Sequence, residues 1–193
     1  MTAQSATTSA RTFGFAIHNL LRLRRNLTPL FFSTFLPVFF YLLFGTMMDF
    51  GNASFKGGNF AALEMISMAL YGGVAGSVSA AGSAVTDTKT GWARQLALTP
   101  LHPQQILWAN LTSIGFQALL PITAVFITGA MTQAAMQPHQ WVLAIIACVL
   151  VSIPFGFYGL VWAMALPTDN SVAIASTSVV LFLFAANVFT PLT

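Results

Sequence analysis

Charge is the scarcest feature of this sequence. Seven Lys and Arg and four Asp and Glu make up 6% of its 193 residues, while 56% are hydrophobic and the mean hydropathy is +0.79. A soluble domain carries about 25% charged residues, because its surface must be covered with groups that water solvates. This chain cannot cover such a surface, so its outside must face lipid.

Motifs for several common chemistries are also missing. The sequence has no G-x-x-x-x-G-K-[S/T] loop for ATP phosphates and no G-x-S-x-G nucleophile motif. Its single cysteine, Cys148, excludes a disulfide or thiolate framework, and His18, His102 and His139 are too scattered for a metal site. Its cations form no basic face for nucleic acid. We therefore expect a non-catalytic protein without cofactor, metal or nucleic-acid partner.

Long apolar runs fill the chain instead. About 20 residues at 1.5 Å rise cross a hydrocarbon core about 30 Å thick. Five runs approach or exceed this length, at about 28–48, 60–86, 106–128, 141–166 and 171–189. The predicted fold is all-α: a polytopic membrane helical bundle that forms one transmembrane permease domain over residues 1–193, with a kink at Pro37. Because the chain stops at Thr-Pro-Leu-Thr directly after the fifth run, we expect these to be five of six spans.

Cations in short connections set the orientation of such a chain. Six of the seven fall on one side and one on the other: Arg11, Arg22, Arg24, Arg25, Lys89 and Arg94 against Lys56. We therefore expect the N-terminus and the 87–104 connection to be cytoplasmic.

Residues 11–25 have the pattern of an amphipathic helix. Four basic side chains share one helical stripe: Arg11, His18, Arg22 and Arg25. We expect this helix to lie in the membrane plane, with Arg22, Arg24 and Arg25 toward the lipid headgroups. Two interpretations are open, an elbow that braces a transport domain and a plain positive-inside anchor.

Small residues dominate the second apolar run. Gly72, Gly76 and Ala80 are four residues apart, a spacing that lets helix backbones approach closely. Since small residues occupy nearly every face, we expect contact with more than one helix. Packing explains this pattern, and a moving wall of a transport pathway is an open alternative.

Glu64 is the one acid within an apolar run. An acid inside a membrane is costly and points to function by default, which makes Glu64 a candidate pathway residue. It lies only seven residues past Gly57, however, so the favoured interpretation is a hydrated position at the outer interface.

The connection at 87–104 carries the strongest functional signal. Residues 90–98 can form a short helix with Trp92 and Leu96 on one face, which Pro100 would end. Such a helix is a suitable handle for a cytosolic partner. Spacing alone slightly favours the alternative, an interfacial loop anchored by Trp92.

The run Gly-Trp-Ala-Arg-Gln-Leu-Ala-Leu-Thr-Pro-Leu at 91–101 resembles the cytoplasmic loop of ABC-2 type transporter permeases. In the most similar bacterial branch the loop reads Gly-Trp-Leu-Arg-Gln-Leu-Arg-Leu-Thr-Pro-Leu. Ala93 and Ala97 depart from that pattern, and Ala97 removes a cation. The arginine-rich start before a Phe- and Pro-rich run and the closing Asn-Val-Phe-Thr-Pro-Leu at 187–192 are also similar. Those permeases have six spans, of which this chain would cover about five.

The resemblance implies the transmembrane subunit of a bacterial ABC exporter in the inner membrane, in a family that includes multidrug exporters. It implies three partners: a separate cytosolic ATP-binding subunit on the elbow and the loop, a second permease chain, identical or different, and membrane lipid. The expected ATPase-coupling residues are Gly91, Trp92, Arg94, Leu96, Thr99 and Pro100. The low charge content suits an amphipathic or lipid-like cargo.

Two other functions stay open at this point. An ion-coupled secondary transporter would place ionisable residues or broken helices at mid-membrane, where Glu64 is the single acid available. A non-transporting structural subunit would make the 91–101 motif irrelevant to any ATPase.

Cysteine labelling checks the predicted topology. In a Cys148→Ser background, an impermeant maleimide added to intact cells should label Ser54→Cys and leave Thr90→Cys unlabelled. The first position lies in an expected outer connection and the second in the expected cytoplasmic one. Labelling of Thr90→Cys from outside would overturn the topology.

Overall fold

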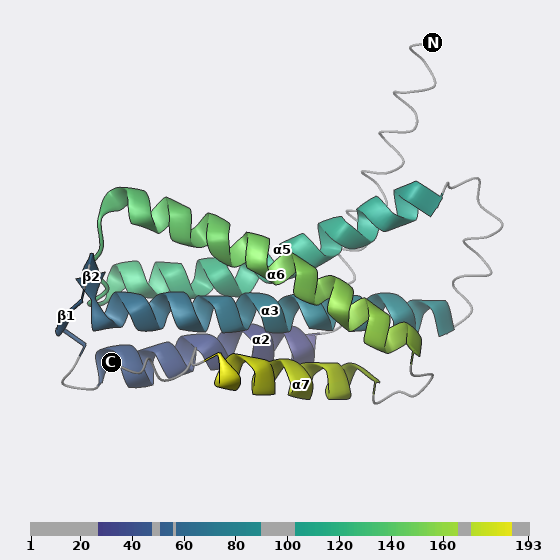
Figure 1. Ribbon diagram of the computed structural model, residues 1–193, viewed down its shortest axis with the longest axis horizontal. Coiled ribbons are helices and arrows are strands. Elements are labelled where there is room, and N and C mark those ends of the chain that lie inside the picture. Colours follow the sequence, from purple (N-terminus) through teal and green to yellow (C-terminus); the bar gives the residue numbers. More distant parts are fainter. Residues whose placement is uncertain (1–26, 48–50, 56, 90–102, 166–170, 187–193) are drawn as a thin grey trace, which may run out of the picture.

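A bundle of α-helices accounts for most of the chain (Figure 1). The computed structural model describes residues 27–47, 51–55, 57–89, 103–165 and 171–186. Its helices are α2 (Leu27–Phe40), the π-helical turn η1 (Tyr41–Thr46), α3 (Phe60–Lys89), α5 (Pro103–Met131), α6 (Pro138–Ala165) and α7 (Ser171–Ala185). The prediction of an all-α helical bundle is confirmed. The predicted 11–25 helix and a sixth span lie outside the described residues.

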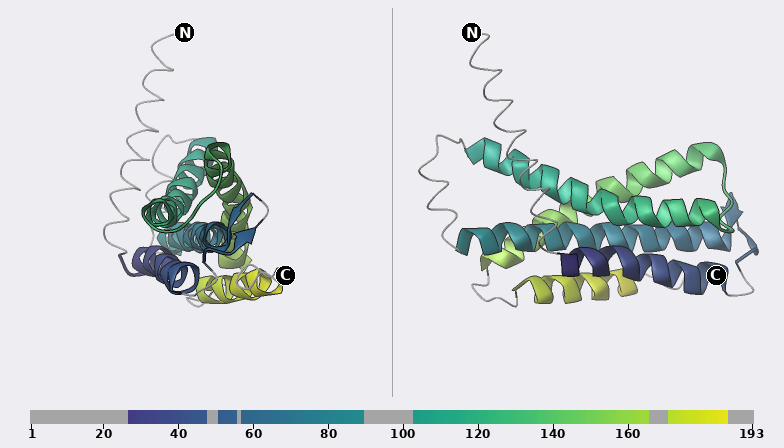
Figure 2. Two further views of the ribbon diagram at one scale, coloured as in Figure 1. Left: turned by 90° about the vertical axis from the view of Figure 1, so that its left-hand side faces the viewer. Right: turned by 180° about the vertical axis from the view of Figure 1, so that it is seen from behind.

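Helix α3 is the centre of the bundle. It contacts α2, η1, α5, α6 and α7, and the end-on view in Figure 2 shows neighbours around it. Within the 18-residue window that qualifies Phe60–Gly82 as apolar, 67% of the residues are buried, against 28% in the corresponding window of Pro138–Ala165 in α6. Small side chains on most faces of α3 allow this crowding, as its sequence predicts.

The outer surface of the bundle is apolar. Helix α6 exposes large aliphatic side chains along much of its length: Val142, Leu143, Ile146, Leu150, Val151 and Val161. Three helices, Phe60–Gly82, Asn110–Met131 and Pro138–Ala165, are long and apolar enough to cross a membrane. Outward-facing apolar side chains on such helices are solvated favourably by lipid, so this is a membrane protein.

Two clusters of buried side chains join the helices. The first lies between η1, α3, α5 and α6 and includes Tyr41 and Met68. The second lies between α3, α6 and α7 and includes Val78 and Val179. Each cluster is accompanied by a tyrosine hydrogen bond, between Tyr41 Oη and Thr132 Oγ1 at 2.6 Å and between Tyr158 Oη and Ser178 Oγ at 2.8 Å. These bonds join η1 to the turn after α5, and α7 to α6.

The first helix is irregular beyond its proline. Helical geometry continues through Pro37 and changes to a π-helical turn at Tyr41. At the end of that turn, the Met47 N–H donates to the Leu42 carbonyl at 3.2 Å, the five-residue step of a π-helix.

A short β-hairpin, which the sequence did not predict, closes one end of the bundle. Strands β1 (Ser54–Phe55) and β2 (Gly58–Asn59) pair antiparallel, and Gly57 has the positive φ of 90° that a turn of this kind requires. Gly58 also forms a bridge with Met136, in the connection between α5 and α6.

Asn59 fastens the start of α3 to that connection. Its Oδ1 accepts from the Ala62 N–H at 3.0 Å, which makes it the N-cap of α3, and from the Ala135 N–H at 2.9 Å. Its Nδ2 donates to the Gln133 carbonyl at 2.5 Å, and its backbone N–H donates to the Ala135 carbonyl at 3.1 Å. One side chain therefore ties α3 to the α5–α6 turn.

Replacing this side chain tests its contribution. We expect Asn59→Ala to lower the free energy of unfolding by about 1–2 kcal/mol, because α3 loses its cap and the 132–137 turn loses two partners. Thermal unfolding in detergent can be followed by the reaction of the buried Cys148 with a fluorogenic maleimide. The exposed Asn52→Ala is the control, and an equal shift for both would refute the assignment.

Candidate functional site

The predicted coupling residues lie outside the part of the chain that the structure describes. This holds for Gly91, Trp92, Arg94, Leu96, Thr99 and Pro100, and for the elbow residues Arg22, Arg24 and Arg25. The described helices show where the predicted coupling segment attaches, because α3 ends at Lys89 and α5 begins at Pro103. Proline is favoured in the first turn of a helix because its fixed φ suits that position, and Pro103 lies there in α5.

The glycines of α3 lie where its neighbours come closest. A Cβ atom added at Gly72 would lie 2.9 Å from Pro121 of α5 and 3.0 Å from Pro37 of α2. One added at Gly73 would lie 2.5 Å from the hydroxyl of Ser152 on α6 and 2.8 Å from Ile122. Real Cβ atoms do not sit this close to other atoms, so α3 packs against three helices through its own backbone.

Gly76 faces backbone rather than side chain. An added Cβ would collide with the carbonyl oxygen of Gln117 and its carbon, neither of which can rotate away. Ala80, one turn further, is buried with 4% of its surface exposed. The residues Gly72, Gly76 and Ala80 thus form the buried seam on which α3 meets its neighbours.

Two of the groups that contact this seam are backbone carbonyls that have no helical N–H donor, because the residue four positions later is a proline. Pro37 has no N–H to donate to Ser33 O, and Pro121 has none to donate to Gln117 O. The Ser33 oxygen approaches Gly72, where it would lie 3.2 Å from an added Cβ. The Gln117 oxygen approaches Gly76. A glycine Cα–H is a weak donor to such an oxygen. The glycine spacing in the sequence indicated close packing, but it could not show that these two carbonyls are the groups that contact the glycines.

Glu64 lies inside the bundle. Only 1% of its surface is exposed, and its Oε1 has no hydrogen-bond partner among the described residues. The interpretation of Glu64 as a hydrated interfacial residue is therefore wrong, because the helix turns it inward on the same face as the fully buried Ala61 and Met68. Two neutral oxygens share its lack of a partner, those of Thr34 and Ser77.

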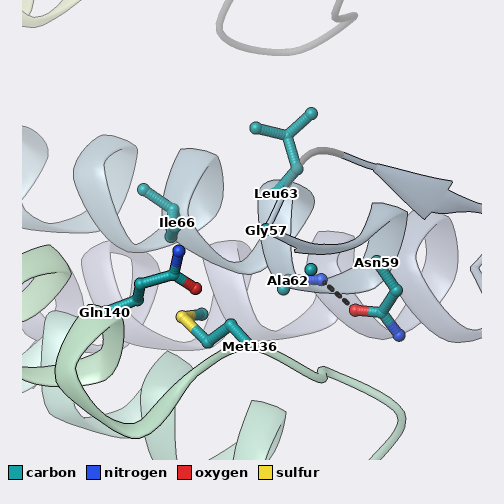
Figure 3. A pocket seen from close by; sticks show the side chains of 8 residues that line it. Gly57, Asn59, Ala62, Leu63, Ile66, Met136 and Gln140 are labelled. Carbon is teal, nitrogen blue, oxygen red and sulfur yellow. Dashed lines mark hydrogen bonds between the residues drawn. The ribbon is translucent and has the colours of Figure 1, made fainter.

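A cavity of about 250 Å³ opens beside the start of α3 (Figure 3). It is lined by Gly57, Gly58, Asn59, Ala62, Leu63, Ile66, Met136 and Gln140. Figure 3 shows Gln140 and Met136 on one side of it and Ile66 and Ala62 of α3 on the other. The described residues of the lining contribute amide and apolar groups.

Comparison with known proteins gives one informative similarity. The chain is 22% identical over 178 residues to "Putative transport permease YvfS" of Bacillus subtilis (strain 168), a match that covers 91% of this chain and 72% of that protein. Comparison with protein-family models gives no match, and no solved structure matches. The similarity extends along nearly the whole chain.

The seam can be tested with a pair of glycines. Gly76→Ala should destabilise the bundle by about 1–3 kcal/mol, since the new methyl group meets fixed backbone. Gly115→Ala on α5 is the matched control, because nothing lies within 4 Å of its added Cβ. That variant should be neutral or slightly stabilising, as Ala favours helices over Gly by about 1 kcal/mol. Thermal unfolding in detergent compares the two, and equal midpoints would contradict the seam.

Proposed function

We propose that this transport permease is the membrane-spanning subunit of an ABC-type exporter. A separate cytosolic ATPase supplies the energy, and the cargo is amphipathic or lipid-like. The observation that carries the proposal is the 91–101 motif between two helices, together with the similarity to a transport permease over 91% of the chain. The all-α membrane bundle supports it.

The fold offers a mechanical reason for placing the ATPase at 90–102. This segment continues directly from α3, the helix that every other described helix contacts. A force on the segment would therefore act first on the centre of the bundle. The seam brings the backbone of α3 within contact of α2, α5 and α6, so a shift of α3 would be transmitted to all three helices. ATP binding in the partner would bias such a shift only through contacts that differ between the two states.

In this proposal the N-terminal arginines and the loop face the cytoplasm of a bacterial cell and form the docking surface. Two permease chains, identical or different, complete the pathway. Trp92, Arg94 and Leu96 supply the principal contacts, because an aromatic ring and a guanidinium are the groups that most often dominate an interface.

The burial of Glu64 supports one alternative function, an ion-coupled secondary transporter. An ion-coupled transporter needs an ionisable group inside the bundle, and Glu64 is such a group. Proteoliposomes that contain the permease alone discriminate the two functions. Flux driven by an ion gradient without an ATPase would favour the rival, and no flux until ATPase and ATP are added would favour the exporter.

Substitutions in the loop test the coupling directly. Trp92→Ala and Arg94→Glu should each weaken binding of the cytosolic ATPase subunit by about 2 kcal/mol, or roughly 30-fold. Co-purification and substrate-stimulated ATP hydrolysis measure the loss. Trp108→Ala is the control, because this tryptophan lies in the second turn of α5 and is 65% exposed. Wild-type behaviour of both loop variants would contradict the proposal.

A further inference from the structure

Burying Glu64 at its position in α3 costs free energy. It is the one charged residue of the apolar stretch Phe60–Gly82 and lies about 6 Å along the axis from Phe60. Its surface is 99% buried and Oε1 accepts no hydrogen bond. A carboxyl oxygen that is buried without a partner loses its hydration and gains no hydrogen bond in return, so the packing of the described residues does not by itself account for an acid here.

The surroundings of Glu64 suit an organic cation. Its neighbour Met65 and Met68, one turn away, pack in one buried cluster with the ring of Tyr41 from η1. Aromatic rings attract cations through their negative faces, and thioethers adapt to irregular apolar groups. A carboxylate next to such a cluster combines a charge for the cation with an apolar environment for its substituents.

The segment opposite α3 is also the irregular part of the first helix. Helix α2 contains Pro37, and η1 follows it as a π-helical turn in which Gly45 lies against the Tyr41 ring, 2.8 Å from an added Cβ to that ring. Such π-helical turns frequently mark functional positions in helices. Helix α3 contacts η1. Met68, which lies one turn from Glu64 on the same face of α3, packs with Tyr41 of η1 in one buried cluster, so Glu64 lies on the face of α3 that continues from this contact.

We propose that Glu64 recognises lipophilic organic cations, which bind between α3 and η1 when these two elements separate. The carboxylate then gains a charge partner, which the described residues do not supply in the closed bundle, and the cation's apolar groups contact the methionine and tyrosine side chains. This proposal rests on the exporter function above and names the substrate class of that exporter. It predicts discrimination by charge and not by shape.

Binding to the purified chain tests the charge preference. The probes are tetraphenylphosphonium and its anionic counterpart of similar shape, tetraphenylborate, measured by equilibrium dialysis in dodecyl maltoside, whose headgroup is uncharged. Wild-type protein should bind the cation at least tenfold more tightly than Glu64→Gln does, while tetraphenylborate should not lose affinity in this variant. Glu64→Asp should retain part of the preference, because it keeps the charge.

A neutral variant separates the charge from general disruption. Thr34 also has a buried oxygen without a partner, so Thr34→Val removes a buried polar group without changing charge and should bind like wild type. Equal cation binding by wild type and Glu64→Gln would overturn the proposal. So would an equal loss for both probes, or no binding above that of empty micelles.

The source of the cation and the exporter function are tested separately. If added phosphatidylcholine displaces the probe and phosphatidylglycerol does not, the recognised cation is a lipid headgroup. If neither displaces it, the cation is a soluble amphiphile. Both outcomes support recognition by Glu64. The dialysis contains no ATPase, and Glu64→Gln should still co-purify with the ATPase, so failure of the cation proposal is distinguishable from failure of the exporter proposal.

Discussion

The close approach of α3 to its neighbours is the constraint on which the rest of the bundle depends. In lipid, the hydrophobic effect does not draw helices together, and close van der Waals contact has to hold them. The glycines of α3 allow this contact, and they also receive two carbonyl oxygens that Pro37 and Pro121 leave without a helical donor. Prolines on α2 and α5 and glycines on α3 are therefore parts of one arrangement, although they are far apart in the sequence.

Much of the fold could be predicted from the sequence, because lipid imposes a simple rule on composition. A shortage of charge and runs of about 20 apolar residues allow little other than helices. The boundaries follow from local chemistry as well: Pro103 begins α5, and small residues along 69–86 place α3 among several neighbours. The hairpin at 54–59 could not be predicted, since its strands contain two residues each and depend on contacts with the α5–α6 turn.

The candidate site was less predictable for a physical reason. Distance along the chain placed Glu64 near a helix end, where water was the expected neighbour. Its burial depends instead on which side of the helix the residue occupies. Successive residues are rotated by about 100° around the helix axis, so a shift of one position in the sequence can move a side chain from the surface into the core. The role of Asn59 shows the opposite case. An Asn before an apolar helix is a local capping signal, whereas its bonds to Gln133 and Ala135 are visible only in three dimensions.

The two tyrosine hydroxyls add polar contacts to elements that apolar packing already holds. Asn59 joins α3 to the α5–α6 turn through its side-chain hydrogen bonds, and the glycine seam brings the backbone of α3 against α2, α5 and α6. The outlying elements η1 and α7 pack on α3 through the two buried clusters, and each also forms one phenol hydrogen bond, Tyr41 with Thr132 and Tyr158 with Ser178. A hydrogen bond of this kind contributes about 0.6 kcal/mol on average inside a membrane, close to thermal energy. The phenols therefore select the register in which η1 and α7 sit on their neighbours, while the apolar clusters supply the cohesion.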